Sequence, residues 1–254
     1  MASSKRSGTR VNWLDATRGA AVILMIIYHT CWDLVFLFGH HIGWFANHPD
    51  LLLNRIICFS FILISGYSVG LSRQILRRGV IVFLCGAAIT VVTLVFTPNN
   101  PIWFGILTFI GSAMLIMAVL DKGLKKAPAI PGIIICLFLF VLFYHVIEGR
   151  LSFFTFPVAT ISKGLYKNYI TAYLGFPFKG FISEDYFSIL PWIFLYMTGY
   201  FAYQATSDFA KKTAGPIRKW GLLSLLGRYS LQIYIVHQGV IFVVLKILNW
   251  AGII

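Results

Sequence analysis

Residues 18–38 read RGAAVILMIIYHTCWDLVFLF, an apolar stretch long enough to cross a bilayer as one helix. The hydrocarbon core of a bilayer is about 30 Å thick, and about 20 helical residues are needed to cross it. Comparable stretches follow along the chain, without the period-two alternation that is typical of half-buried strands. The predicted spans are 18–38, 51–71, 79–97, 102–120, 129–147, 187–204 and 230–250. The sequence therefore predicts an all-α, polytopic membrane helical bundle of about seven transmembrane helices.

The composition agrees with a membrane protein, because 59% of the residues are hydrophobic and only 11% are charged. Soluble proteins carry about 25% charged residues, so a soluble fold is excluded. No internal repeat is visible, and we expect residues 1–254 to form a single transmembrane domain. Its longest piece outside the spans, 148–186, is rich in Phe and Tyr. We expect this amphipathic segment to lie on the membrane or to fold over a cavity.

The basic residues indicate the orientation of the chain in the membrane. Of the 21 Lys and Arg residues, 15 lie before or at the start of the first span, or in the loops after the second, fourth and sixth spans. They are Lys5, Arg6, Arg10, Arg18, Arg73, Arg77, Arg78, Lys122, Lys125, Lys126, Lys211, Lys212, Arg218, Lys219 and Arg228. By the positive-inside rule this side is cytoplasmic. The N-terminus is then predicted inside, and the C-terminus and segment 148–186 outside.

The net charge of +13 does not indicate a nucleic-acid partner. The cations lie in short loops beside membrane spans, where anionic headgroups of the lipid bilayer are the nearer partner. The four cysteines, Cys31, Cys58, Cys85 and Cys136, fall inside predicted spans without CxxC spacing. We therefore expect neither a metal site nor a disulfide framework. Segment 205–221, which contains Gly215-Pro216, is interpreted as a basic connector.

A stripe of ionisable residues runs along the first predicted helix. At about 100° per residue, Asp15, His29 and Asp33 lie within about 60° of Arg18, and His40 would extend the stripe if the helix reached it. His29 lies about 16 Å and Asp33 about 22 Å along the axis from Arg18. Ionisable residues inside a membrane helix face the bundle and find partners there, and they usually have a function. The stripe therefore predicts a polar cavity that begins at the cytoplasmic side.

Two interpretations of the stripe are open at this point. A neutral imidazole that is oriented by a carboxylate can act as a general base, with His29 as the base and Asp33 as its orienting group. The structural alternative pairs Asp15 with Arg18 at i,i+3, and Asp33 with His29 at i,i+4.

The last span carries a second polar face, on which Ser230, Tyr234 and His237 lie within about 60° of one another. Arg228 stands at its cytoplasmic end, where Gly227 would let a phosphate approach the backbone and the guanidinium would hold it. Ordinary membrane anchoring is the alternative for Arg228, and a satisfied core histidine is the alternative for His237.

Outside these two spans, Asp185 lies at the outer end of the sixth span, close to Trp192, and would orient a substrate there. A solvated loop carboxylate is the alternative for Asp185. Gly66 and Gly111 are interpreted as packing residues, because small side chains allow membrane helices to approach closely.

Several short motifs, taken in order, resemble the heparan-alpha-glucosaminide N-acetyltransferase-like family, related to the acyltransferase type three superfamily. The pieces are Leu14-Asp15-Ala16-Thr17-Arg18-Gly19, His29 and Asp33, Ile64-Ser65-Gly66, Phe104-Gly105-Ile106-Leu107, Asp185-Tyr186-Phe187, Pro191-Trp192, and Gly227-Arg228-Tyr229-Ser230-Leu231 through His237. The chain departs from bacterial relatives at Thr108, where a histidine is expected after Phe-Gly-Ile-Leu.

The resemblance implies transfer of an acetyl group from cytoplasmic acetyl-CoA to an amine or hydroxyl outside the membrane, often on a sugar. Arg18 would match the family position at the inner mouth, and His29 would match the intramembrane catalytic position of the type three enzymes. The expected location is a bacterial plasma membrane.

We therefore predict an acetyl-CoA-dependent acetyltransferase with an extracytoplasmic sugar or glycan acceptor and no metal. The predicted catalytic residues are His29, Asp33 and His40; the predicted CoA-binding residues are Arg18, Arg228, Tyr234 and His237; the predicted acceptor-binding residues are Asp185 and Trp192. Direct attack on the thioester and a transient acetyl-histidine both stay open, as does assembly into a homo-oligomer. The main rival is a small transporter or flippase that uses the stripe as a proton relay. A non-enzymatic membrane assembly subunit is a third reading.

Overall fold

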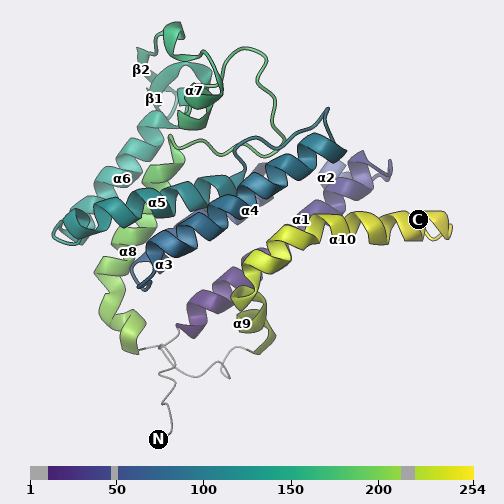
Figure 1. The fold of residues 1–254 in the computed structure, drawn as a ribbon, viewed down its shortest axis with the longest axis horizontal. Coiled ribbons are helices and arrows are strands. Elements are labelled where there is room, and N and C mark those ends of the chain that lie inside the picture. The colour runs from purple at the N-terminus through teal and green to yellow at the C-terminus, as the bar shows by residue number, and fades with distance from the viewer. Residues whose placement is uncertain (1–10, 47–50, 213–220) are drawn as a thin grey trace, which may run out of the picture. The chain divides into compact units, whose positions relative to one another are not determined.

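The structure is a computed structural model that describes residues 11–46, 51–212 and 221–254 (Figure 1). The helices are α1 (Asn12–Phe36), α2 (Gly43–Ala46), α3 (Leu51–Val69), α4 (Ile75–Phe96), α5 (Ile106–Leu124), α6 (Ala129–Phe143), α7 (Tyr169–Leu174), α8 (Trp192–Lys212), α9 (Gly221–Arg228) and α10 (Ser230–Trp250). Two short 3₁₀ helices, η1 (Val146–Glu148) and η2 (Lys163–Leu165), and two strands, β1 (Arg150–Phe153) and β2 (Phe156–Thr160), lie between α6 and α7. The predicted basic residues Lys5, Arg6, Arg10, Arg218 and Lys219, and the Gly215-Pro216 part of the connector, lie outside the described residues.

Six helices among the described residues are long and apolar enough to cross a membrane. They lie at Asn12–Phe36, Leu52–Val69, Ile75–Phe96, Ile106–Leu124, Ala129–Glu148 and Ser230–Trp250, and each overlaps a predicted span. The all-helical membrane architecture that the sequence predicts is therefore confirmed. The seventh predicted span corresponds to α8, which is long but more polar, with Gln204 and Asp208 in its second half. A count of seven crossings stays a prediction.

The predicted helix bounds need correction at two functional positions. The helix predicted at residue 102 begins only at Ile106, because Phe104 has a positive φ of 54° and Gly105 serves as the N-cap. The first helix ends at Phe36, and Gly39 with φ +73° turns the chain away before His40. His40 therefore does not extend the helical stripe.

The chain divides into two compact units, 1–61 with 206–254 and 62–205. In the first unit, α9 and α10 pack against α1 (Figure 1). Two glycines make the α1–α9 contact close: a Cβ atom on Gly19 would lie 2.0 Å from the carbonyl oxygen of Leu223, and one on Gly227 would lie 1.7 Å from that of Asp15. Any larger residue at either position would collide with the backbone of the opposite helix. That the whole chain acts as one domain remains a prediction.

In the second unit the most extensive helix contact joins α4 and α5, which run side by side in Figure 1. A Cβ atom on Gly111 would lie 2.4 Å from the Phe83 nitrogen, so α4 and α5 touch at backbone distance there. A Cβ atom on Gly66 of α3 would lie 2.0 Å from the carbonyl oxygen of Tyr196 in α8. The packing role predicted for Gly66 and Gly111 is therefore confirmed.

Segment 148–186 contains structure that the sequence pattern did not predict. The strands β1 and β2 form an antiparallel hairpin in which Phe153 pairs with Phe156, with an irregularity between Leu151 and Ser152. The strands contain only four and five residues, so the alternation that would reveal them is too short to recognise. The helix α7 follows, and Asn168 and Thr171 form a capping box at its N-terminus.

Candidate functional site

At the beginning of α1, Arg18 and Asp15 form an ion pair with a distance of 2.9 Å between Nη1 and Oδ1. This is the i,i+3 pair that the helical spacing predicts. It leaves this end of the stripe close to electrical neutrality without removing the guanidinium from the solvent, because both side chains remain partly exposed. The structural interpretation of Asp15 is therefore confirmed.

Two histidines from different helices meet farther along α1. The rings of His29 in α1 and His237 in α10 lie with their centroids 4.9 Å apart. His237 is only 8% exposed, and its Nδ1 lies 2.5 Å from the backbone carbonyl of Tyr234. A carbonyl only accepts hydrogen bonds, so Nδ1 carries a proton, and in the neutral ring Nε2 keeps its lone pair. This Nε2 atom is buried and has no hydrogen-bond partner among the described residues.

The carboxylate of Asp33 is fully buried, with 0% exposure. The Gln238 side chain donates from Nε2 to both of its oxygens, at 2.9 and 3.0 Å. The predicted bond from His29 to Asp33 is not among the hydrogen bonds of the part of the chain that the structure describes. The reason is that Gln238, next to His237 on α10, reaches Asp33 from across the helix contact and occupies both oxygens.

His40 lies beyond the end of α1, where its backbone nitrogen donates to the carbonyl of Leu34 at 2.9 Å. Its Nε2 atom is buried and has no hydrogen-bond partner among the described residues. The residue is therefore placed near the C-terminal end of α1 by a turn and not by helical periodicity. Helical spacing did not predict this turn.

The second predicted arginine, Arg228, ends α9 and is exposed, with its guanidinium 5.7 Å from the Tyr229 ring. The neighbouring Gly227 does not face a ligand, because the backbone of α1 at Asp15 fills the space in front of it. The expectation that Gly227 admits a phosphate is therefore wrong. The same contact places the backbone of Arg228 beside the turn of α1 that carries Arg18, so both arginines belong to one helix crossing.

In the second unit, Asp185 acts on the beginning of α5. Its Oδ2 atom accepts a hydrogen bond from the Ile106 nitrogen at 3.0 Å, and a Cβ atom on Gly105 would lie 2.8 Å from Oδ2. Helix N-termini carry unpaired N–H groups and a partial positive charge, which a carboxylate stabilises. The interaction explains why the Phe104-Gly105-Ile106-Leu107 and Asp185-Tyr186-Phe187 motifs occur in one chain: the second motif caps the helix that the first begins.

The remaining predicted site residues have aromatic neighbours. The Trp192 ring lies 4.8 Å from that of Phe187 and 5.6 Å from that of Phe140. Tyr234 lies on α10 with its ring 5.3 Å from His237, so it belongs to the histidine contact. Thr108, at the position where relatives are expected to carry histidine, is buried against α4, where a Cβ atom on Gly86 would lie 2.5 Å from its Oγ1. A threonine fits this contact because the two helices are so close.

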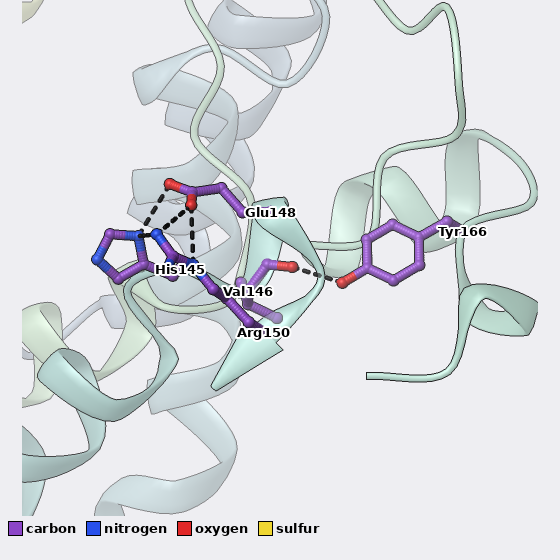
Figure 2. Close-up of polar contacts among 5 residues, drawn as sticks. All are labelled: His145, Val146, Glu148, Arg150 and Tyr166. Atoms are coloured by element: carbon purple, nitrogen blue, oxygen red, sulfur yellow. Dashed lines mark hydrogen bonds and ion pairs between the residues drawn. The ribbon is translucent and has the colours of Figure 1, made fainter. Parts of the chain in front are cut away.

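Two sets of polar residues were not singled out from the sequence. Gln238 follows His237 and lies one helical turn after Tyr234, so the spacing on α10 could have revealed it. His145, Glu148 and Arg150 form a cluster at the end of α6, shown in Figure 2. The three side chains meet because the chain turns through η1, and the sequence has no periodicity that predicts this turn. No group of three or more His, Cys, Asp or Glu residues that could hold a metal ion occurs within 11–46, 51–212 and 221–254.

Comparison with known proteins gives one match. Residues 10–239 match the family model described as heparan-alpha-glucosaminide N-acetyltransferase, catalytic. The match covers most of the chain and includes each of the predicted site residues, from Arg18 to His237. No curated protein and no solved structure matches the chain.

Proposed function

The chain belongs to the heparan-alpha-glucosaminide N-acetyltransferase catalytic family, and from this premise we propose where and how it transfers an acetyl group. The family and the apolar helices make it an integral membrane protein of an acetyltransferase family. Our proposal is that acetyl-CoA binds from the cytoplasm, and that the acetyl group passes to an amine or hydroxyl of an extracytoplasmic sugar. The contact between His29 and His237 is the proposed reaction centre.

The observation that carries this proposal is the buried, unpartnered Nε2 of His237 beside the His29 ring. Burying a polar atom without a hydrogen bond costs about 1–3 kcal/mol in proteins. Such an atom in a membrane helix is expected where a substrate supplies the missing partner. A neutral imidazole nitrogen with an available lone pair is also the group that general-base catalysis requires.

The proposed step transfers the acetyl group directly or through an acetyl-histidine. In direct transfer, the acceptor nitrogen or oxygen attacks the thioester carbonyl, the C–S bond breaks, and CoA leaves as a thiolate. His29 accepts the proton of the acceptor and can pass it to the departing sulfur. In the covalent route, an imidazole nitrogen of His29 attacks the thioester carbonyl, and the C–S bond breaks to release CoA as a thiolate. The acceptor then attacks the acetyl-imidazole, loses its proton, and the C–N bond to His29 breaks. His237, held by the Tyr234 carbonyl, offers its own unpartnered Nε2 beside the His29 ring as a second base in both routes.

The donor end of the proposed site is the crossing of α1 and α9. Arg18 and Arg228 are its cations, and guanidinium groups bind phosphates bidentately, as the CoA pyrophosphate would require. Along α1, His29 lies about 16 Å from Arg18, a separation that the extended pantetheine arm of CoA would have to bridge. Tyr234 would contact this arm beside His237.

The buried Asp33 has a different proposed role from the one its spacing indicates. Its bonds to Gln238 tie α1 to α10 directly beside the histidine pair. We assign Asp33 the role of holding the two helices in register, so that His29 and His237 stay in contact. On the acceptor side, His40 is proposed to contact the sugar, and its unpartnered Nε2 supports this assignment. The acceptor contacts expected of Asp185 and Trp192 stay predictions.

The direction of the two helices in the first unit supports seven crossings. The α9 end that precedes α10 lies against the beginning of α1, and His237 meets His29 farther along both helices. Thus α1 and α10 start at the same side of the membrane and run in the same direction. The chain between the end of α1 and the start of α10 must then cross the membrane an odd number of times. The helices α3, α4, α5 and α6 give four crossings, so α8 is needed as the fifth. We therefore propose that the C-terminus is extracytoplasmic, in a bacterial plasma membrane.

A reporter fused after Ile254 tests this topology. Alkaline phosphatase is active only outside the cytoplasm, whereas green fluorescent protein exported in unfolded form does not fluoresce there. We expect an active phosphatase fusion and a dark fluorescent-protein fusion. The reverse pattern would leave six crossings and would contradict the parallel arrangement of α1 and α10.

The donor is tested by isothermal titration of the purified protein with acetyl-CoA and CoA. We expect the unaltered protein to bind acetyl-CoA, and Arg18→Ala to raise the dissociation constant at least about tenfold. The reason is that one charge-assisted phosphate contact contributes about 1.5–3 kcal/mol. Lys246→Ala, which removes a cation from the far end of α10, is the matched control and should bind normally. No binding of acetyl-CoA by the unaltered protein would overturn the proposal.

The contact of two imidazole rings from separate helices also fits the rival reading, a transporter in which histidines relay protons. Proteoliposomes with a pH-sensitive dye inside distinguish the two readings. A proton flux that depends on His29 and needs no acetyl-CoA would favour the transporter.

A further inference from the structure

The β1–β2 hairpin is unusually apolar for a chain segment outside a helix. Residues 151–160 carry no charged side chain, and all five residues of β2 are exposed. The hairpin end presents Phe153, Phe154 and Phe156, which are 40%, 66% and 73% exposed. Large aromatic side chains at this exposure on a short hairpin are expected to meet a partner other than water.

The hairpin runs back along α6 instead of away from it. The ring of Phe153 lies 5.7 Å from that of Phe138, an exposed residue in the second half of α6. From His145 back to Phe138 the helix descends about 10 Å, at 1.5 Å per residue. From Arg150 to Phe153 the strand covers about the same 10 Å, at 3.3 Å per residue. The helix length from Phe138 to His145 and the strand length from Arg150 to Phe153 therefore agree. Both place the hairpin end level with the outer half of a membrane-spanning helix.

The opposite end of the hairpin is charged. The Glu148 carboxylate lies between an imidazole and a guanidinium, 2.8 Å from Nδ1 of His145 and 2.6 Å from Nη2 of Arg150 (Figure 2). The Tyr166 hydroxyl donates to the carbonyl of Val146 at 2.5 Å and ties the following segment to the same turn (Figure 2). Burial raises the pKa of Tyr166, which keeps this hydroxyl protonated as a donor. Charges at the base and phenylalanines at the end match the change from headgroups to hydrocarbon.

We propose that the hairpin end, Phe153 to Phe156, inserts into the lipid interface beside α6 and that the His145–Glu148–Arg150 cluster lies at headgroup level. The occupant of its apolar surface is lipid, because Phe153 continues the surface that Phe138 already presents to the bilayer. Aromatic side chains are enriched at the membrane interface. The hairpin is a two-stranded sheet, so one edge of β2 has no strand partner, and hydrocarbon disfavours such an edge. Pro157 removes one N–H donor from β2.

Insertion would fix the outer end of α6 and η1 at a defined depth. The hairpin, the charged cluster and Tyr166 form one connected unit, since the Ile161 nitrogen also donates to the Gly149 carbonyl at 2.8 Å. Segment 148–186 would then begin at the membrane surface. This inference concerns the membrane contact alone and does not depend on the acetyltransferase activity.

Nitroxide accessibility in liposomes tests the inference. The four native cysteines are replaced, and single labels are introduced by Phe154→Cys and Phe156→Cys in the full chain. Collision rates with oxygen, which concentrates in lipid, and with a water-soluble nickel chelate are measured by electron paramagnetic resonance. Ile134→Cys on the exposed face of α6 serves as the lipid reference, and Lys163→Cys in η2 serves as the water reference.

We expect labels at 154 and 156 to have an oxygen-to-nickel ratio several-fold above that at 163 and close to that at 134. A ratio equal to that at 163 would overturn the inference and place the hairpin in water. Low collision rates with both reagents would also overturn it, because the hairpin end would then be covered by protein, for example by a second copy of the chain. Labels at two exposed positions guard against a local disturbance, since both must agree.

Discussion

The α1–α10 contact in the first unit and the α4–α5 contact in the second unit use the membrane environment in opposite ways. Around α1 and α10, a buried carboxylate and two histidines meet, and one buried imidazole nitrogen has no partner among the described residues. Between α4 and α5, glycines such as Gly111 bring the backbones together, and no ionisable side chain is buried at the Gly111–Phe83 approach. Helices in lipid are held by close packing of small residues. The Asp33–Gln238 bonds also join their two helices, whereas the His29–His237 contact is the one to which we assign a catalytic purpose.

The largest expected effect separates the two contacts by activity. His29→Ala and His237→Ala should each lower the initial rate of acetyl transfer by about 10²–10⁴-fold, because general-base catalysis contributes about that much. Thr108→Ala, which removes a buried hydroxyl from the α4–α5 contact, should change the rate less than about twofold. The measurement follows release of the CoA thiol with glucosamine as the acceptor. Equal losses in all three variants would abolish the distinction between the two contacts.

A stability effect of the next size should be common to both units. Gly227→Ala and Gly111→Ala place a methyl group within 2.4 Å of a backbone atom, so each should lower the free energy of unfolding by roughly 1–3 kcal/mol or more. Gly239→Ala in α10 is the control, because its Cβ would meet nothing within 4 Å. It should stabilise α10 slightly. Thermal unfolding in detergent, followed by reaction of the buried Cys136 thiol with a fluorogenic maleimide, measures these differences.

The carboxylate of Asp185 should have a smaller effect on stability. Asp185→Ala removes the acceptor at the beginning of α5 and should cost roughly 0.5–2 kcal/mol, as loss of a helix cap does. Asp185→Asn keeps an acceptor oxygen and should lose less. Glu184→Ala, one residue earlier and exposed, is the control in the same unfolding assay. If Asp185→Ala is as stable as Glu184→Ala, the capping interaction contributes nothing measurable.

The smallest effect concerns the exposed ion pair in the second unit. Lys125 lies 2.6 Å from Asp121, but its side chain is 64% exposed. Exposed pairs contribute about 0–1 kcal/mol, so Lys125→Ala should leave the unfolding temperature within about 2 °C. Tyr200→Phe should cost more, because the Tyr200 hydroxyl donates to the less exposed Asp121 carboxylate at 2.8 Å.

The membrane class, the helix positions and the Arg18–Asp15 pair follow from composition and from helical spacing, which are local properties of the chain. The partner of Asp33 does not, because Gln238 comes from a helix 205 residues later. Helical spacing along α1 indicated only His29 as the partner of Asp33. The actual partner lies on α10, and only the fold brings α1 and α10 together.

Two further features escaped the sequence for other physical reasons. His40 was placed on the helical stripe by extending a period past the point where Gly39 ends it. The role of Gly227 was read as access for a ligand, whereas the glycine permits access for a helix. A glycine indicates close approach, but the sequence does not say what approaches.

The central claim is that the acetyl group lies beside His29 and His237 during transfer. Labelling with bromoacetyl-CoA tests this claim most directly. The imidazole nitrogen nearest the acetyl position displaces bromide and forms a stable bond, which peptide mass spectrometry locates without any acceptor. The protein would carry Cys31→Ala, so that this neighbouring thiol does not compete. We predict modification of His29 or His237 that excess acetyl-CoA prevents. Modification confined to residues outside α1 and α10, or unaffected by acetyl-CoA, would contradict the proposed reaction centre.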